Sequence, residues 1–270
     1  MWSEFSLARL GLAFALSFLV AGAGWRLRAL SASGAVSAFL MGGIVYGVGG
    51  WGAAAVLLTF FVTSSLLSRA FALRKQDLNR VVLKGSQRDV WQVLANGGFG
   101  TLCILTGMVF PHSPFPFLAF CGSLAAANAD TWATELGVLS TQPPRLLING
   151  RRVPRGASGG VTWLGLFASL LGAMLIGGVA AFFVSEAWLT ILAVSLGGML
   201  GSLLDSVLGA GWQAVYFCPR CQMETERHPL HSCGEATHLQ RGIAWLNNDM
   251  VNFACTVLGG FVAGAFGLFY

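Results

Sequence analysis

Charged residues are scarce in this sequence. Lys, Arg, Asp and Glu together make up 10% of its 270 residues, whereas hydrophobic residues make up 55%. Soluble domains usually carry about a quarter charged residues, so this composition excludes that class. Glycine is abundant, with 36 residues, as it is in closely packed transmembrane helices. The composition therefore indicates a polytopic membrane protein.

A familiar nucleotide-binding signature is also lacking where basic residues meet a glycine-rich turn. The segment RRVPRGASGGVT, residues 151–162, matches neither the Walker A motif nor the GxGxxG motif, so neither a P-loop nor a Rossmann site is predicted there. The sequence also lacks a soluble basic domain that could hold nucleic acid. We therefore expect no nucleic-acid partner.

Eight apolar segments are long enough to span a membrane. They lie near residues 5–24, 32–49, 51–68, 91–110, 115–137, 160–184, 187–209 and 243–268. The first segment is also consistent with a signal peptide, but the basic residues Arg26 and Arg28 that follow it favour an uncleaved helix. We therefore predict an all-α polytopic membrane protein, with one transmembrane domain of about eight helices over residues 1–270.

The basic residues are unevenly distributed between the loops. With eight spans, fifteen of the sixteen fall on one side and only Arg9 falls on the other. The positive-inside rule makes the basic side cytoplasmic and places both termini outside. This concentrated charge suits anionic lipid headgroups and phosphorylated substrates. The fifteen residues are Arg26, Arg28, Arg69, Arg74, Lys75, Arg80, Lys84, Arg88, Arg145, Arg151, Arg152, Arg155, Arg220, Arg227 and Arg241.

The segment NADTWATELG, residues 128–137, places two carboxylates at the end of an apolar run. On a helix, Asn128, Asp130, Thr131, Thr134 and Glu135 fall within an arc of roughly 160°, which must face protein or water. A helix end that emerges into the cytosol would also explain a solvated glutamate. Ionisable groups at membrane depth are candidates for function, however.

Two further segments place polar groups on the same side. In GGMLGSLLDSVLGAGWQ, Asp205 lies on a stripe of small residues towards the end of the seventh predicted helix. In RGIAWLNNDMVN, helical spacing puts Arg241, Asn248 and Asp249 on one face. Hydrogen bonding between helices would explain any one of these groups. The predicted catalytic residues are Asp130, Glu135, Asp205, Asn248 and Asp249, which three helices bring to one depth.

A group of carboxylates repels itself unless a cation or a proton is shared. The sequence places no imidazole or thiolate at this depth, and oxygen ligands favour Mg²⁺ over zinc or copper. In proteins Mg²⁺ is usually shared between one or two carboxylates and substrate phosphates. We therefore predict an Mg²⁺ site formed by Asp130, Asp205 and Asp249.

The segment RRVPRGASGGVT, residues 151–162, combines arginines with a glycine-rich turn before a helix. Backbone N–H groups at such a helix start bind anions, although tight packing also explains many glycine-rich turns. The predicted substrate-binding residues are Asn128, Thr131, Thr134, Arg151, Arg155, Gly156, Ser158, Gly159, Gly160, Thr162 and Arg241.

A weak internal similarity supports placing a helix start directly after the basic loop that contains this glycine-rich turn. ASGAVS at 32–37 resembles ASGGVT at 157–162, and each begins a predicted helix after a basic loop. A duplicated unit of four helices would explain the similarity.

The predicted cytoplasmic loop 210–242 is rich in cysteine and histidine. Cys218 and Cys221 form a CxxC motif, followed by His228, His231 and Cys233. Two thiolates plus two of the other three groups would complete a tetrahedral zinc site. A reducing cytosol favours a metal over a disulfide. We expect a structural zinc site, with His231 and Cys233 completing it.

Four segments resemble successive motifs of a known membrane family. They are NADTWATELGVLS, VPRGASGGVT, GSLLDSVLGA and WLNNDMVN. They are similar to motifs of the polytopic family that contains plant phytyl-phosphate kinase, itself distantly similar to the CTP-dependent phytol and dolichol kinases. The likeness runs from about residue 30 to the C-terminus.

The resemblance implies phosphoryl transfer from a nucleoside triphosphate, CTP in the first instance, onto an isoprenyl monophosphate in the bilayer. The product would be a prenyl diphosphate such as phytyl diphosphate. Two alternatives remain open: a cytidylyltransferase that makes a CDP-lipid, and a transporter of a small anionic or lipid substrate. Release of CDP rather than pyrophosphate would identify the kinase. A homo-oligomer is compatible with each of these functions.

Overall fold

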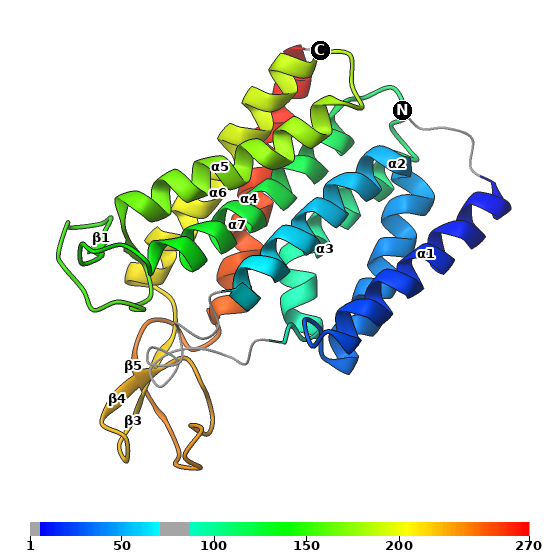
Figure 1. Ribbon diagram of the computed structural model, residues 1–270. Helices are drawn as coiled ribbons and strands as arrows, with labels where there is room; N and C mark the ends of the chain where they lie inside the picture. The colour runs from blue at the N-terminus through cyan, green and yellow to red at the C-terminus, as the bar shows by residue number, and fades with distance from the viewer. Residues whose placement is uncertain (1–5, 71–86, 270) are drawn as a thin grey trace.

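The computed structural model describes residues 6–70 and 87–269, which form a helical bundle with two small sheets at one end (Figure 1). The predicted helical class is thus confirmed. The helices are α1 (Leu7–Arg26), α2 (Ala32–Ala70), α3 (Val90–Thr106), α4 (Phe115–Gly137), α5 (Trp163–Ala181), α6 (Ala187–Gly211) and α7 (Asn248–Ala265), followed by the 3-10 helix η1 (Phe266–Phe269).

Two small antiparallel sheets correct the all-α prediction. One pairs β1 (Arg145–Leu146) with β2 (Gly160–Val161), and the other has the strand order β4-β3-β5. The strands of the second sheet are β3 (Val215–Cys218), β4 (Met223–Thr225) and β5 (His238–Arg241). Strands of two to four residues are too short to show an alternating pattern in the sequence.

The structure has five helices that are long and apolar enough to cross a membrane, within the residues that it describes. They are α1, α2, α5, α6 and α7 extended through η1. The helix α3 is apolar but shorter. These counts support a polytopic membrane protein and do not confirm the predicted number of eight spans.

The helix α2 is broken at Gly50, where φ is 72° and ψ is −164°. Figure 1 shows that the two halves of α2 run in opposite directions on either side of this break. The Arg9 guanidinium of α1 donates to the carbonyl oxygens of Tyr46 and Val48, each at 3.2 Å. It therefore satisfies carbonyls that lose their helical partners at the break. Residues 32–49 and 51–68, predicted as separate helices, correspond to these halves.

The two segments that suggested a duplication differ in local structure. Residues 32–37 already lie inside α2, whereas α5 begins only at Trp163, after the segment 157–162. The similar residues therefore do not occupy equivalent positions relative to a helix start. The duplication stays a prediction.

The helix α4 lies at the centre of the bundle. It packs against α2, α3, α5, α6 and α7, and every residue from Pro116 to Ala129 is buried. A helix that is apolar on nearly all sides is stable when other helices surround it. Complete burial ends at Asp130, which is half-buried.

Small residues allow α4, α6 and α7 to approach one another closely. A methyl group at Gly122 of α4 would collide with Ala263 and the Gly259 carbonyl of α7. One at Gly198 of α6 would lie 3.0 Å from the side chain of Ala125 on α4. Such contacts are typical of membrane helices whose backbones pack tightly. Side chains at the ends of these three helices consequently converge.

The basic loops lie at one end of the bundle. Figure 1 shows the end of α4, the start of α5, the end of α6 and the start of α7 gathered there with both sheets. Arg9 lies at the opposite end, beside the break in α2. The basic residues Arg74, Lys75, Arg80 and Lys84 lie outside the described residues.

Candidate functional site

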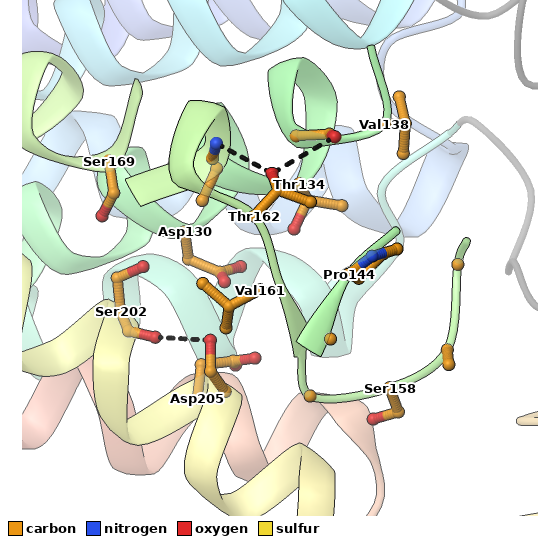
Figure 2. A pocket seen from close by; sticks show the side chains of 18 of the residues that line it. Asp130, Thr134, Val138, Pro144, Ser158, Val161, Thr162, Ser169, Ser202 and Asp205 are labelled. Carbon is orange, nitrogen blue, oxygen red and sulfur yellow. Dashed lines mark hydrogen bonds between the residues drawn. The ribbon is translucent and has the colours of Figure 1, made fainter. Parts of the chain in front are cut away.

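A polar cavity of about 250 Å³ lies at the end of the bundle that carries the basic loops. Figure 2 shows its walls, which come from α4, α5, α6, the start of α7 and the segment before α5. The predicted site residues that line it are Asp130, Thr134, Arg155, Gly156, Ser158, Gly159, Gly160, Thr162, Asp205 and Asn248.

Two carboxylates enter this cavity from different helices. Asp130 comes from α4 and Asp205 from α6 (Figure 2), and both are half-buried. Both side chains therefore line one and the same cavity. The Cys255 thiol of α7 donates to Oδ2 of Asp205 at 3.7 Å. Two neighbouring carboxylates with few protein donors fit a divalent cation that prefers oxygen ligands, such as Mg²⁺.

A glycine turn forms the wall that packs against the end of α6. Gly156 has φ +85° and Gly159 has φ +77°, which are left-handed values that favour glycine. At Gly159 a methyl group would also collide with the backbone of Ala210 and lie 2.6 Å from the carbonyl oxygen of Ser206. Gly159 is therefore needed for close packing on α6, and Gly156 only for its backbone conformation.

Thr162 caps the start of α5 beside the cavity. Its Oγ1 accepts a hydrogen bond from the N–H of Gly165 at 3.0 Å and donates to the carbonyl of Gly137 at 3.4 Å (Figure 2). One of the free N–H groups of the helix start is thus already satisfied. The positive end of the α5 dipole still faces the cavity and favours an anion there.

Arg155 provides a positive charge at the cavity wall. Its guanidinium donates to the carbonyl oxygens of Ser140 at 2.7 Å and Thr141 at 3.3 Å, and the side chain is exposed. These bonds hold the segment after α4 against the segment before α5. A guanidinium has five N–H donors, so it can also bind a phosphate oxygen.

Asn128 and Glu135 face neighbouring helices. Asn128 is fully buried, accepts hydrogen bonds from Thr63 and Ser64 of α2, and donates to the carbonyl of Gly172 on α5. Glu135 is buried and accepts from Ser68 of α2 at 2.8 Å. The polar arc of α4 therefore splits between helix packing and the cavity.

Four other predicted residues do not line the cavity: Thr131, Arg151, Arg241 and Asp249. Thr131 donates to the carbonyl of Ala127 one turn back. The Arg241 guanidinium donates to the carbonyl oxygens of Gly209 and Ala210, so it caps the end of α6. Asp249 is buried in the first turn of α7, where a negative charge is favourable.

Sequence reasoning missed several polar residues of the cavity wall. They are Gln92, Ser169, Gln213 and Glu226. Gln213 links three segments, because it accepts from Ser158 Oγ and donates to Glu226 Oε1, both at 2.8 Å. Ser202 and Ser206 also line the cavity, and their place on the small-residue stripe with Asp205 could have identified them.

The cysteine-rich segment forms a compact cluster of metal-ligand type. One ligand atom from each of Cys218, Cys221, His231 and Cys233 lies within 4.8 Å of every other. The Sγ atoms of Cys218 and Cys233 are 3.6 Å apart. Tetrahedral Zn–S bonds of about 2.3 Å give a separation of about 3.8 Å. Three thiolates and one imidazole in this arrangement fit a structural zinc ion.

His228, the remaining candidate ligand, has a different role. Its ring stacks on Tyr216 with the centroids 4.3 Å apart. In the cluster itself, His231 Nδ1 lies 3.3 Å from Cys233 Sγ. The hydrogen bond with His231 is the main reason that the pKa of Cys233 falls to about 6. A thiolate is thereby favoured at Cys233, whereas the hydrogen bond with Cys233 raises the pKa of Cys221 to about 11. A metal ion would therefore have to displace the proton of Cys221 when it binds.

The cysteine cluster and the cavity belong to one structural unit. Cys218 ends β3, Cys221 lies in the turn before β4, and Glu226 follows β4 directly. Gln213 precedes β3 and bonds Glu226. A metal in the cluster would therefore hold the sheet whose ends form part of the cavity wall.

Comparison with the sequences of known proteins shows to which membrane family the chain is similar. The sequence profile described as integral membrane protein DUF92 matches residues 15–260. Protein PGR of Arabidopsis thaliana is 32% identical over 94% of this chain and 94% of its own length. An uncharacterized membrane protein of Methanocaldococcus jannaschii is 29% identical over 87% of this chain and 84% of its own length.

A third relative is Protein VTE6, chloroplastic, of Arabidopsis thaliana. It is 24% identical over 92% of this chain and 68% of its own length. These matches agree with the resemblance, seen in the four motifs, to the family that contains plant phytyl-phosphate kinase. No solved structure matches the chain.

Proposed function

This chain belongs to the integral membrane protein DUF92 family, and from that premise we propose that it is a phosphotransferase acting on a lipid monophosphate. The acceptor would be an isoprenyl monophosphate such as phytyl monophosphate, and the donor a nucleoside triphosphate, with CTP as the first candidate. The observation that carries this proposal is the pair Asp130 and Asp205, which come from two helices and line one cavity with Arg155 and the start of α5.

In this proposal a phosphate oxygen of the acceptor attacks the γ-phosphorus of the nucleotide. The new P–O bond gives a prenyl diphosphate, and cleavage of the bond to the β–γ bridging oxygen releases the nucleoside diphosphate. An acceptor that is already an anion needs no strong general base. Catalysis then depends on positioning and on stabilising the negative charge of the transferring group.

The residues of the cavity can divide this work. Asp130 and Asp205 would hold Mg²⁺, which would neutralise the phosphate charge in the transition state. Arg155 and the α5 start would bind phosphate oxygens, while Asn248 and Ser158 offer neutral polar contacts. By the positive-inside rule this end of the bundle faces the cytoplasm, where a nucleotide is available.

A product assay tests the proposal. Purified protein in detergent or liposomes is supplied with Mg²⁺, CTP and phytyl monophosphate, and the expected products are CDP and phytyl diphosphate. Pyrophosphate and a CDP-lipid would instead show attack at the α-phosphorus and identify a cytidylyltransferase. Absence of transfer from each of the four nucleoside triphosphates would reject both reactions. Passage of the anion across sealed liposomes would then identify a transporter.

A further inference from the structure

A second cavity, of about 540 Å³, lies among α1, α2 and α3. Its size is within the usual range of small-molecule sites, about 300–1,000 Å³. The lining is almost entirely apolar and includes Leu16, Met41, Leu57, Phe61 and Val93. Close-packed protein interiors contain few voids of this size, and an apolar cavity attracts apolar ligands rather than water.

One end of this apolar cavity meets the candidate site. Gln92, in the first turn of α3, lines both the apolar cavity and the polar cavity. Arg88 lies beside it, with its guanidinium carbon 5.4 Å from the centre of the Phe60 ring. A positive charge and an amide thus mark the point where the two cavities approach each other. This arrangement complements a ligand with an anionic head and an apolar tail.

The other end lies beside the break in α2. Tyr46 and Trp51 line it with their rings 4.5 Å apart, together with Phe183, which follows the end of α5. Trp51 and Phe60 are about 13 Å apart along the helix axis at 1.5 Å per residue. The apolar cavity therefore extends from the candidate site well into the bundle, as a lipid tail bound by its head would require.

We propose that the apolar cavity holds the tail of the lipid monophosphate acceptor, and that Trp51 and Phe183 at its far end limit the length of tail accepted. The inference rests on the proposed function, because it names the tail-binding part of the same site. The phosphate of the acceptor would lie near Arg88 and Gln92 and face the carboxylates of the polar cavity.

Two substitutions with opposite effects test this inference. Ala54→Phe fills the far end, because Ala54 lines the cavity one turn from Trp51, whereas Phe183→Ala enlarges it. We measure kcat/KM for geranyl, farnesyl, geranylgeranyl and phytyl monophosphates. Ala54→Phe should lower the value for the two longest acceptors by about tenfold or more relative to geranyl monophosphate. Phe183→Ala should shift the preference towards longer tails.

The matched control is Ala15→Phe, which adds the same ring on an exposed face of α1 that does not line the cavity. It should leave the length profile unchanged. Equal losses for all four acceptors in Ala54→Phe would overturn the inference. An unchanged profile with a lower melting temperature would also overturn it, and would indicate that the cavity holds only bilayer lipid.

A binding measurement separates this inference from the proposed function. A prenyl monophosphate with a photoactivatable group at the tail end should label residues near Trp51 and Phe183, whether or not phosphate is transferred. Unlabelled phytyl monophosphate should compete with the label. Labelling confined to lipid-facing surfaces of α5–α7 would reject the tail site even in an active enzyme. Labelling at the far end without transfer would reject only the proposed reaction.

Discussion

The two parts of this bundle enclose cavities of opposite chemistry. The cavity among α1, α2 and α3 is apolar, whereas that between α4, α5 and α6 is lined by three carboxylates, an arginine and a glycine turn. The packing differs as well, since α4 is surrounded by helices while α1 packs mainly against α2. A rigid, central helix suits precise placement of reacting groups, and a peripheral helix suits entry of a lipid from the bilayer.

Glutamine at position 92 connects the two parts. It lines both cavities and belongs to the capping box that starts α3, in which Asp89 accepts from its backbone N–H at 3.0 Å. The start of α3 is therefore fixed in place where head and tail of a lipid would separate. Substitutions in the polar cavity should change the turnover of every acceptor equally. Substitutions in the apolar cavity should have effects on turnover that depend on the length of the acceptor's tail.

The largest effect should follow removal of either of the two helical carboxylates in the polar cavity, Asp130 and Asp205. Asp130→Asn and Asp205→Asn each keep the volume of the side chain but remove a charge that would hold a hard cation. We expect each variant to fold and to lose on the order of a hundredfold or more in turnover, about 3 kcal/mol of transition-state stabilisation, for all acceptors. Turnover and melting temperature are measured together.

Glu186→Gln is the control for these two variants. It removes the same charge at an exposed position before α6, away from the polar cavity. Its turnover should match the wild type. Near wild-type turnover in Asp130→Asn would contradict the metal-site assignment, and a low melting temperature with normal specific activity would assign Asp130 to packing.

A smaller effect should follow substitution in the glycine turn. Gly159→Ala faces both a left-handed φ of +77° and a collision with the α6 backbone. Gly156→Ala faces a similar φ of +85° with open space around it. The conformational cost of about 1–2 kcal/mol is common to both. Only Gly159→Ala should also displace the wall of the cavity and reduce turnover by about tenfold or more.

Comparing Gly159→Ala with Gly156→Ala isolates what the contact with α6 contributes to stability and turnover, because the backbone strain is alike in the two variants. Thermal unfolding should show the larger loss of stability in Gly159→Ala. Equal losses of both stability and turnover would mean that the contact with α6 does not position the turn.

The sheet beside the polar cavity gives a third prediction. Purified protein should contain about one zinc ion per chain, and Cys221→Ser should lose it with a lowered melting temperature. Turnover should fall several-fold, because Glu226 and Gln213 would lose their support. His238→Gln is the control, since His238 is exposed on β5 of the same sheet. Metal analysis that finds no zinc in protein purified without chelators would refute the prediction.

Sequence patterns predicted the polar cavity better than its surroundings. Asp130 and Asp205 were recognisable because each interrupts an apolar helix near the same end. The hydrogen-bond partner of Glu135 was not recognisable. Ser68 is 67 positions away in the sequence, and only the packing of α2 on α4 brings its hydroxyl to the Glu135 carboxylate. No sequence pattern identified Glu226 as a residue of the cavity wall. Its position depends on the β3–β4 hairpin, whose strands are too short to show a pattern.

The apolar cavity was beyond the reach of sequence patterns for a related reason. Leu16, Leu57 and Val93 are ordinary residues of membrane helices, and only the angles between three helices leave a space among them. The predicted boundary between the apolar segments 32–49 and 51–68 coincides with the break in α2 at Gly50. The reversal of direction at that break agrees with the prediction of two successive spans, because such spans must run in opposite directions.

The smallest effect should follow loss of the Arg155 charge. Arg155→Gln keeps an N–H donor for the carbonyls of Ser140 and Thr141 but removes the positive charge from the cavity wall. Because this side chain is exposed, its attraction for a phosphate is weakened by solvent, and a loss of about 0.5–1 kcal/mol is expected. That loss should appear as a rise of roughly two- to fivefold in KM for the phosphorylated substrates.

Arg151→Gln provides a matched control, because Arg151 lies in the same loop, is exposed, and does not line the polar cavity. If Arg155 contacts a phosphate, raising the ionic strength should increase the wild-type KM towards that of Arg155→Gln, since salt screens exposed charges. The KM of Arg151→Gln should follow the wild type at every ionic strength. Equal shifts in the two variants would show that the loop acts only through its overall charge, and the specific phosphate contact would then have to be withdrawn.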